Sequence, residues 1–388
     1  MLHLLHLLTL IFALPMLNPD HKLKIVLKRQ EALLSQVPKF SLLKPSSMPN
    51  FLSSSNQVTL ENFWNQQFVG TIGIGTPPQY LTVIFDTGSG NFFVNSELCK
   101  SRSCQSREAY DHEVSSTYSS LNLEIGVQFG SGLVRGVLGN DTLLIGGVEI
   151  SGQNFAEVTY ESGSVFYYAK FSAIMGLGFN SLAHDDTVPV FDHIVNSKYL
   201  EWNVFSFYYS LNQEDESELV IGDVDHSKYY GHMHWVPVTK DPYYWTVVVS
   251  DVRFGEKSLG LCDDGCLMAL DTGTTLILAP SEAVQKIYKG IENACDLNDM
   301  PDMIFIIDGK KYAIPATSYM ISINRGETEE PGVHDDLTPD QCLFAISSLD
   351  IDPPYGPVWV LGNIFMHSYY VAFDRDSMSI GFARSINT

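Results

Sequence analysis

Short apolar runs separated by Gly, Asn and Asp make up most of the chain from Phe68 onward. Runs of this length, rich in β-branched and aromatic residues, are typical of β-strands. The pattern predicts strands over residues 81–85, 121–129, 143–150, 219–221 and 244–249. Helical spacing is clearest over 188–194 and 281–291, and Ser281 is expected to be the N-cap of the second helix. The sequence therefore predicts a mainly β protein.

The tripeptide Asp-Thr-Gly occurs twice, at 86–88 and 271–273, each time after an apolar run. One such tripeptide is weak evidence, because Asp-x-Gly after a strand is more often an ordinary turn. An apolar pair followed by Gly also recurs, at 174–176 and 360–362, and the two glycines lie 90 residues beyond Asp86 and 91 beyond Asp271. The repeated spacing indicates a duplicated unit, in which each half braces its own Asp with a second apolar strand.

Two carboxylates at the ends of buried strands can face each other across a cleft between the halves. They can then share one proton and avoid carrying two like charges at short range. The ionised member can act as a general base toward water, and the neutral member as an acid toward a carbonyl. Gly permits the tight turn after each Asp, and the Thr hydroxyl is expected to brace that turn by hydrogen bonding. The pattern favours Asp86 and Asp271 as a catalytic pair.

The residues around these motifs resemble the pepsin-like aspartic endopeptidases of the pepsin and cathepsin D type, over nearly the whole chain. The matching segments are 68–79, 86–94, 369–374 and 380–383. The resemblance implies a bilobal fold of two pseudo-twofold-related β lobes with the active-site cleft between them. It also implies a nucleophilic water between Asp86 and Asp271, and hydrogen bonds to their outer oxygens. The residues expected to support the dyad are Thr87, Gly88, Ser89, Thr272, Gly273 and Thr274, with Ser89 and Thr274 making those hydrogen bonds.

A mobile hairpin is predicted over residues 124–139, where two β runs meet at Gly-Ser-Gly. In the pepsin-like family the matching hairpin is the flap that closes over the substrate. Phe129 stands where that family normally has Tyr, and Phe93 where it usually has Trp. Because those two side chains commonly hydrogen-bond in the family, replacing both polar ends avoids an unsatisfied buried group. We expect an apolar contact between Phe93 and Phe129, with two ordinary core Phe residues as the alternative.

The expected flap and substrate-binding residues are Phe129, Gly130, Ser131, Phe93 and Tyr244. Tyr244 is left open between a pocket position and a strand position, and Trp245 is assigned to the core. Gly90 and Thr275 stand where the family usually has Ser, and neither touches the proposed acid–base pair. Asn140 begins the only Asn-x-Ser/Thr sequence and is a candidate for glycosylation.

The N-terminal residues divide into an apolar stretch and a basic arm. Residues 1–16 are apolar but too short to span a bilayer, which is typical of a signal peptide. Residues 1–44 have a net charge of +4, against −26 for the rest of the chain. This asymmetry favours a basic propeptide over 17–58, held to the acidic body by ion pairs, over a nucleic-acid-binding or membrane-surface arm. Residues 22–29 resemble the first strand of such propeptides, and Lys44 is a candidate to plug the dyad.

The predicted division of the chain follows from these segments. The Ser-, Pro- and Asn-rich stretch 45–58 suits an exposed connector where activation cleavage would fall. The N-terminal lobe is expected over 59–212, with the first Asp-Thr-Gly and the flap, and the C-terminal lobe over 213–388, with the second. The boundary is placed where apolar residues give way to the polar stretch 212–218.

Six cysteines behind a secretory signal are expected to be oxidised. Fifteen connectivities exist for six cysteines. Proximity and the family resemblance together favour the pairs Cys99–Cys104, Cys262–Cys266 and Cys295–Cys342. A zinc site at Cys99 and Cys104 lacks further ligands apart from His112, so no metal site and no cofactor are expected.

The sequence and the resemblance together predict a secreted aspartic endopeptidase, made as a zymogen and acting on peptide bonds flanked by apolar or aromatic residues. Its expected partners are a peptide or protein substrate and its own propeptide as an intramolecular inhibitor, with no nucleic acid and no membrane span, and it is expected to be a monomer. The compartment would be the secretory pathway, ending outside the cell or in an acidic vacuolar or lysosome-like organelle. The alternatives are a catalytically silent peptide-binding relative and a glycosidase with a carboxylate pair. The intact Asp-Thr-Gly-Ser and Asp-Thr-Gly-Thr motifs argue against both.

Overall fold

The computed structural model describes residues 22–30, 67–129, 132–183, 187–212, 215–240, 242–291, 300–322, 342–351 and 356–387. The predicted signal peptide 1–16 lies outside these residues, as does Lys44. Of the predicted propeptide 17–58, residues 22–30 are described. No helix within the described ranges is long and apolar enough to cross a membrane.

Strands dominate the described chain. In the first half they are β1 Leu23–Gln30, β2 Gln67–Ile74, β3 Gln79–Asp86, β4 Phe92–Asn95, β5 Ser119–Phe129, β6 Gly132–Ile145, β7 Val148–Ser162, β8 Ala173–Gly176 and β9 Val204–Tyr208. In the second half they are β10 Ser217–Ile221, β11 Tyr229–Pro237, β12 Thr246–Phe254, β13 Lys257–Ser258, β14 Cys266–Leu270, β15 Ile277–Ala279, β16 Met303–Ile307, β17 Lys310–Ile314, β18 Met320–Ser322, β19 Cys342–Phe344, β20 Ile346–Ser348, β21 Val358–Leu361, β22 Tyr369–Asp374 and β23 Ser379–Ser385. The α-helices are α1 Ser164–Tyr167, α2 Val190–Asn196, α3 Ser281–Ile291, α4 Ala316–Tyr319 and α5 Asn363–Met366.

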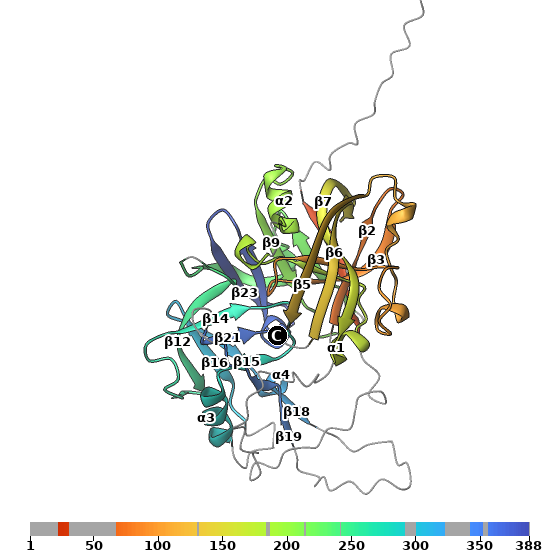
Figure 1. Cartoon of the computed structure of the whole chain (residues 1–388). Coiled ribbons are helices and arrows are strands. Elements are labelled where there is room, and N and C mark those ends of the chain that lie inside the picture. The colour runs from red at the N-terminus through yellow and green to blue at the C-terminus, as the bar shows by residue number, and fades with distance from the viewer. Residues whose placement is uncertain are drawn as a thin grey trace, which may run out of the picture.

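Two large sheets contain nearly all of these strands (Figure 1). The larger has 13 strands in the order β11-β23-β22-β9-β10-β1-β2-β3-β8-β4-β7-β6-β5, and the other has 8, with β17-β16-β12-β14-β21-β15-β20 as its main path. In Figure 1 the orange and yellow strands of the first half form one group, and the teal and blue strands β12, β14 and β16 form another, with α3 below them. The mainly β, two-lobed fold expected from the sequence is confirmed.

The two Asp-bearing strands have the same surroundings in both halves. β3 pairs in parallel with β8, which places Asp86 beside Gly176, and β14 pairs in parallel with β21, which places Leu270 beside Leu361. The prediction that each Asp is braced by a second apolar strand is therefore confirmed.

The glycine after each apolar pair allows the loop that follows the Asp to pack against the brace. A Cβ on Gly176 would lie 2.6 Å from the carbonyl carbon of Gly90, and one on Gly362 would lie 2.3 Å from the carbonyl oxygen of Thr274. Any side chain at these two positions would displace backbone next to the dyad. The repeated glycine thus has a steric cause in both halves.

Some predicted elements differ from the observed ones. Residues 143–150 form two strands rather than one, because Gly146 and Gly147 have φ values of 57° and 84° and make the turn between β6 and β7. The strand predicted over 244–249 begins at Thr246. The second helix is α3 as predicted, but Ser281 is not its N-cap: the carbonyl of Pro280 accepts the first intrahelical bonds, and the N–H of Ser281 donates to Asp350 at 2.9 Å.

The boundary predicted near 212–218 falls between β9 and β10, which pair with each other. The 13-stranded sheet therefore continues through this boundary. The division into segments remains a prediction.

Strand β1 occupies the interior of the 13-stranded sheet. It pairs with β10 on one edge, Leu23 beside Ile221, and with β2 on the other, Arg29 beside Phe68. Leu23, Ile25 and Leu27 are buried. The expected strand over 22–29 is confirmed, and its apolar face belongs to the main core.

Ion pairs join the basic side of β1 to acidic residues of the body, as expected. Lys22 contacts Asp223 at 3.1 Å, and Lys24 contacts both Glu218 and Asp225, the latter at 3.2 Å. Burial raises the pKa of Asp225, but hydrogen bonds from Ser227 and Lys24 outweigh it and hold that pKa below its usual range. Lys24 itself has a raised pKa: burial lowers it, but its bonds to Glu218 and Asp225 prevail.

Glu218 behaves in the opposite way from Asp225. Burial raises the pKa of Glu218 in spite of Lys24, because the residue is only 1% exposed. The two carboxylates that pair with Lys24 therefore have pKa values shifted in opposite directions. On acidification, Glu218 therefore loses its charge before Asp225 does.

A buried histidine lies under the junction of β1 and β2. His367 is 5% exposed, its ring stacks edge-on against Phe68 at 5.7 Å, and no described group hydrogen-bonds its Nδ1. Burial, and then the charge of Arg29, lower the pKa of His367 to about 4, and a hydrogen bond to the backbone of Tyr209 opposes them. The folded protein thus keeps His367 neutral at a pH where an unfolded chain protonates it.

The substitution His367→Gln should flatten the acid side of the stability profile. The unfolded histidine titrates near 6.5 and the folded one near 4, so stability is lost as the pH falls from about 6.5 to about 4, by roughly 3 kcal/mol. Denaturant unfolding of wild type and variant at several pH values between 4 and 7 measures this slope. The exposed His232→Gln is the matched control and should leave the slope unchanged. An equal slope in the His367 variant would contradict the buried, neutral assignment.

Candidate active site

Asp86 and Asp271 are held by matching hydrogen bonds. Asp86 accepts from the N–H of Gly88 at 2.8 Å and from the hydroxyl of Ser89 at 2.6 Å. Asp271 accepts from the N–H of Gly273 at 2.8 Å and from the hydroxyl of Thr274 at 2.7 Å. In each case the backbone bonds Oδ1 and the hydroxyl bonds Oδ2, so both carboxylates are oriented by the same local geometry. The hydrogen bonds expected from Ser89 and Thr274 are therefore present.

Thr87 and Thr272 form hydrogen bonds between the two halves. Thr87 N–H donates to the hydroxyl of Thr272, and Thr272 N–H donates to that of Thr87, each at 3.0 Å. The hydroxyl of Thr87 donates to Leu270 O at 2.7 Å, and that of Thr272 to Phe85 O at 2.6 Å. The sequence predicted that each Thr braces its own turn. The structure corrects this, because the hydroxyl of each Thr bonds the opposite half.

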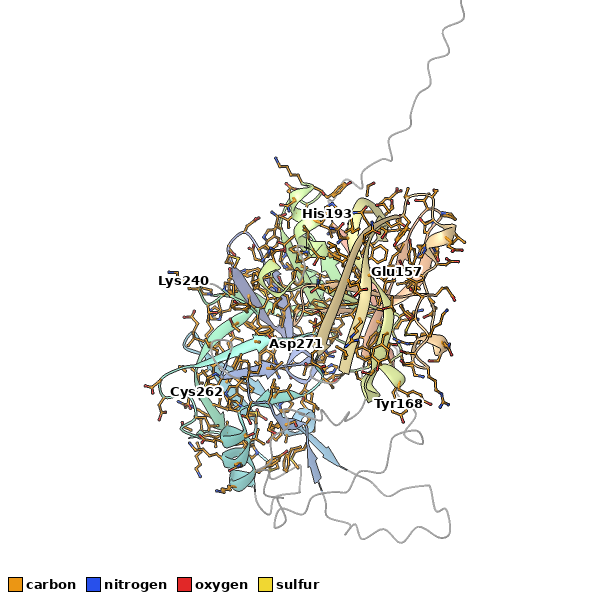
Figure 2. All side chains as sticks on the ribbon, in the orientation of Figure 1. Glu157, Tyr168, His193, Lys240, Cys262 and Asp271 are labelled. Atoms are coloured by element: carbon orange, nitrogen blue, oxygen red, sulfur yellow. A yellow bond between two sulfur atoms is a disulfide. The ribbon has the colours of Figure 1, made fainter. Side chains whose placement is uncertain are left out.

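The two glycines of the motifs make room for the opposite carboxylate. A Cβ on Gly88 would lie 2.8 Å from the carboxylate of Asp271, and a Cβ on Gly273 would lie 2.5 Å from Oδ1 of Asp86. Each glycine was expected to serve its own turn, but it also faces the partner Asp. The two carboxylates therefore lie close to the opposite loop, in space that a side chain at position 88 or 273 would occupy. Figure 2 shows the label of Asp271 near the middle of the molecule, where the two groups of strands meet.

The electrostatics of the pair follow from this proximity. Burial, and then the charge of Asp271, raise the pKa of Asp86 to about 7, although hydrogen bonds from Ser89 and Gly88 act in the opposite direction. The two carboxylates lie within hydrogen-bonding reach of each other. Both residues remain partly accessible to solvent. The surroundings of Asp86 therefore favour its neutral form.

The predicted flap is only partly described. β5 and β6 form the expected hairpin and pair down to Phe129 beside Gly132, and Gly130 and Ser131 lie outside the described residues. Phe93 is 2% exposed and belongs to a core cluster with Ile125 and Val134 of this hairpin. The contact between Phe93 and Phe129 remains a prediction. The role of Tyr244, which is half-buried and lies two residues before β12, also remains a prediction.

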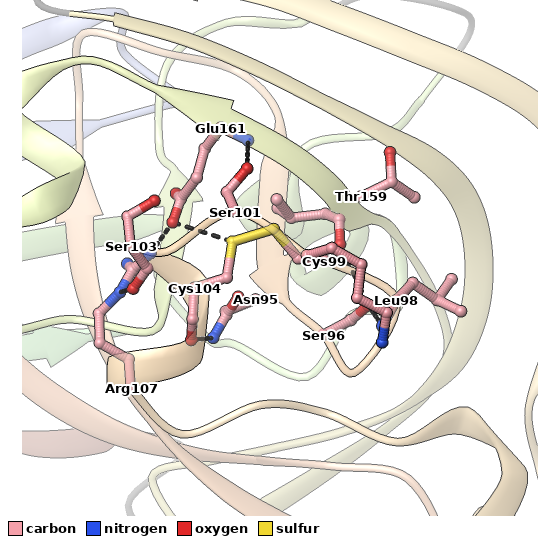
Figure 3. The surroundings of a disulfide bond; sticks show 12 residues. Asn95, Ser96, Leu98, Cys99, Ser101, Ser103, Cys104, Arg107, Thr159 and Glu161 are labelled. Carbon is pink, nitrogen blue, oxygen red and sulfur yellow. Dashed lines mark hydrogen bonds and ion pairs between the residues drawn. A yellow bond between two sulfur atoms is a disulfide. The ribbon is translucent and has the colours of Figure 1, made fainter.

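Two of the predicted disulfides are present. Cys99–Cys104 and Cys262–Cys266 are bonded, and Figure 3 shows the first of them beside Glu161 and Arg107, which form an ion pair. Cys295 lies outside the described residues, so the pair Cys295–Cys342 remains a prediction.

The glycosylation candidate lies within strand β6. The Nδ2 of Asn140 donates to Gly152 O at 2.8 Å and to Asn154 Oδ1 at 2.6 Å, and Thr142 is buried. In the folded protein the amide nitrogen that would carry a glycan is thus already hydrogen-bonded. Glycosylation of Asn140 remains a prediction, and these hydrogen bonds argue against it.

Within the described ranges, no group of three or more His, Cys, Asp or Glu residues could hold a metal ion.

A residue that the sequence assigned only to the core also contacts the segment beside Asp86. Trp245 is fully buried, and its indole N–H donates to Leu177 O at 3.0 Å, just beyond β8. A buried Trp needs an acceptor for its N–H, and this requirement was the available signal.

Comparison with known proteins agrees with the geometry of the site. The family model "Eukaryotic aspartyl protease" matches residues 67–385. Similar proteins include pepsin A of Bos taurus, 35% identical over 84% of this chain and 86% of its own, and cathepsin E of Oryctolagus cuniculus, 36% identical over 86% and 84%. Cathepsin E of Aquarana catesbeiana is 34% identical over 93% of both chains. With its paired Asp-Thr-Gly loops and this match over most of its length, the chain belongs to the eukaryotic aspartyl protease family and is an aspartic-type endopeptidase.

Proposed function

We propose that Asp86 and Asp271 form the catalytic dyad of a secreted peptidase made as a zymogen. The observation that supports this best is the crossed arrangement of the two Asp-Thr-Gly loops, which holds two partly exposed carboxylates within hydrogen-bonding reach. A shared proton is what general acid–base hydrolysis requires.

The reaction divides between the two carboxylates. The raised pKa of Asp86 makes it the neutral member, which donates a hydrogen bond to the scissile carbonyl. Ionised Asp271 takes a proton from water, and the resulting hydroxide attacks the carbonyl carbon while the carbonyl oxygen takes the proton of Asp86. The tetrahedral diol then breaks its C–N bond as Asp271 returns a proton to the amine, and the second hydroxyl gives its proton back to Asp86. No cofactor enters these steps.

The substrate is an extended peptide. The hairpin of β5 and β6 would close over it, and backbone groups of the hairpin would bind its main chain as an added strand does. The preference for apolar or aromatic residues at the scissile bond rests on the resemblance to the pepsin-like family.

The two alternative functions are disfavoured by the same geometry. A silent peptide-binding relative has no need for an intact dyad with its Ser89 and Thr274 bonds. A glycosidase needs carboxylates at least about 5 Å apart, whereas Asp86 and Asp271 are within hydrogen-bonding reach.

The zymogen proposal rests on β1. A basic strand joined to Asp223, Glu218 and Asp225 by ion pairs is well placed to be an intramolecular inhibitor that acid releases. The secretory destination rests on the predicted signal peptide 1–16 and on the two disulfides.

Either Asp86→Asn or Asp271→Asn should lower kcat for peptide hydrolysis by more than about a thousandfold, because each half of the dyad is ineffective alone. Thermal unfolding should change little. The exposed Asp263→Asn is the control and should retain wild-type turnover. Near-normal kcat in either dyad variant would refute the assignment, and hydrolysis of polysaccharide but not peptide by the wild type would favour the glycosidase.

Gly88→Ala should abolish activity through Asp271 rather than through folding. The added methyl would lie 2.8 Å from the carboxylate of Asp271, so that side chain must move away from Asp86. We expect kcat to fall at least about a hundredfold, by the loss of positioning. Gly309→Ala is the control: its φ of 73° makes any side chain strained, yet no atom lies within 4 Å, so it should cost stability and spare kcat. Equal turnover in the two variants would show that the carboxylates tolerate the methyl.

Incubation of the full-length protein at falling pH should produce a shorter chain cleaved within 45–58, with its new N-terminus shortly before Leu60. N-terminal sequencing identifies the cut. The Asp86→Asn variant serves as control and should not process itself. A mature active enzyme that still begins near Pro19 would contradict the zymogen proposal while leaving the dyad intact.

A further inference from the structure

Trp245 connects the two Asp-bearing segments through the backbone. Its Nε1 donates to Leu177 O at 3.0 Å, and the N–H of Leu177 donates to Asp86 O at 2.8 Å. On the other side, the N–H of Leu270 donates to Trp245 O at 3.0 Å, and Leu270 directly precedes Asp271. A single residue therefore joins the backbone of both catalytic loops.

The indole ring is fixed in place by its neighbours. Trp245 is 0% exposed and lies 4.5 Å from the ring of Phe179 and 5.2 Å from that of Phe373. The guanidinium of Arg375 lies over Phe179 at 4.6 Å and over Trp245 at 6.0 Å, and it forms an ion pair with Asp192. These contacts leave the ring no room to rotate, so the position of its N–H is set by the core.

The tryptophan link is separate from the threonine link. Thr87 and Thr272 join the Asp loops to each other directly. Trp245 joins them from behind, through the segment after β8 and the end of β14. With both links present, neither Asp can shift along its strand direction without breaking a buried hydrogen bond.

We propose that Trp245 is a positioning residue for the hydrolytic reaction. It sets the separation of the two carboxylates by binding the segment beside Asp86 with its indole N–H and the end of β14 with its own backbone carbonyl. This inference rests on the proposed catalytic role of Asp86 and Asp271. It assigns to Trp245 no contact with the substrate.

The separation of the carboxylates has a measurable consequence. The charge of Asp271 raises the pKa of Asp86, and this effect weakens with distance. If the link through Trp245 is lost, the carboxylates move apart, the dyad gives up its shared proton at lower pH, and the basic limb of the kcat/KM profile shifts to lower pH. A residue that only fills the core would lower the melting temperature without moving that limb.

The test compares three proteins with the wild type, at full length and after acid processing. Trp245→Phe removes the indole N–H and part of the ring. Replacement of Trp245 by β-(3-benzothienyl)alanine keeps the ring size and removes only the N–H. The control is Trp202→Phe, which loses an indole N–H bonded to Asp374 at 3.2 Å, away from the Asp loops.

For both changes at Trp245 we expect kcat to fall about tenfold, as for the loss of one buried hydrogen bond, with KM within twofold of the wild type. The basic limb should move to lower pH in both, and neither kcat nor the limb should change in Trp202→Phe. If Trp245→Phe does not fold, the benzothienyl variant decides. Wild-type kcat and an unmoved basic limb in that variant would overturn the inference. Absence of peptide hydrolysis in the wild type would refute the proposed function instead.

Discussion

The structure depends on the buried exchange of hydrogen bonds between Thr87 and Thr272. Each threonine donates its N–H to the hydroxyl of the other and its own hydroxyl to a carbonyl of the opposite half. Both side chains are inaccessible to solvent or nearly so, at 0% and 3% exposed. Leaving a buried donor or acceptor without a partner costs about 1–3 kcal/mol. Separation of the halves at this point would break several of these hydrogen bonds at once. This connection holds the carboxylates of Asp86 and Asp271 at short range, because it prevents the two loops from moving apart.

The rest of the site adapts to that constraint. Gly88 and Gly273 have no side chain because the partner carboxylate occupies the space, and Gly176 and Gly362 have none because backbone of the Asp loop does. Ser89 and Thr274 orient the outer oxygens, and Trp245 ties the loops from behind. The repeated glycines in the sequence therefore record close packing around the dyad in both halves.

Much of this could be predicted from the sequence because it repeats. The doubled Asp-Thr-Gly and the matched distances to Gly176 and Gly362 predicted paired strands, and β3 with β8 and β14 with β21 confirm them. What the sequence could not show was which half a side chain reaches. Thr87 and Thr272 are adjacent only in space, so local reasoning assigned each hydroxyl to its own turn. Trp245 was assigned to the core for the same reason, because its acceptor on Leu177 is 68 residues away. The Ser281 cap failed because Asp350, distant in sequence, binds its N–H.

The pKa values of the groups around β1 also depend on how deeply those groups are buried, which composition does not show. A net charge of +4 in the arm predicted ion pairs, and Lys22 and Lys24 make them. Burial raises the pKa of Glu218 in spite of its ion pair with Lys24. The buried His367 adds a second acid-sensitive group beside this strand, and charge counting alone does not find it. Acid thus acts on β1 through groups that titrate in different pH ranges.

The central claim is that Asp86 and Asp271 are held close enough to share one proton. Carbon-detected NMR of side-chain carboxyls, with Asp selectively labelled and Asp86→Asn and Asp271→Asn used for assignment, follows each titration directly. The account predicts that the wild-type pair titrates in two separated steps, with the second step raised above the usual range of an Asp, as the raised pKa of Asp86 requires. Two carboxylates that ionise together at about pH 4, without two separated steps, as independent solvated groups do, would contradict it.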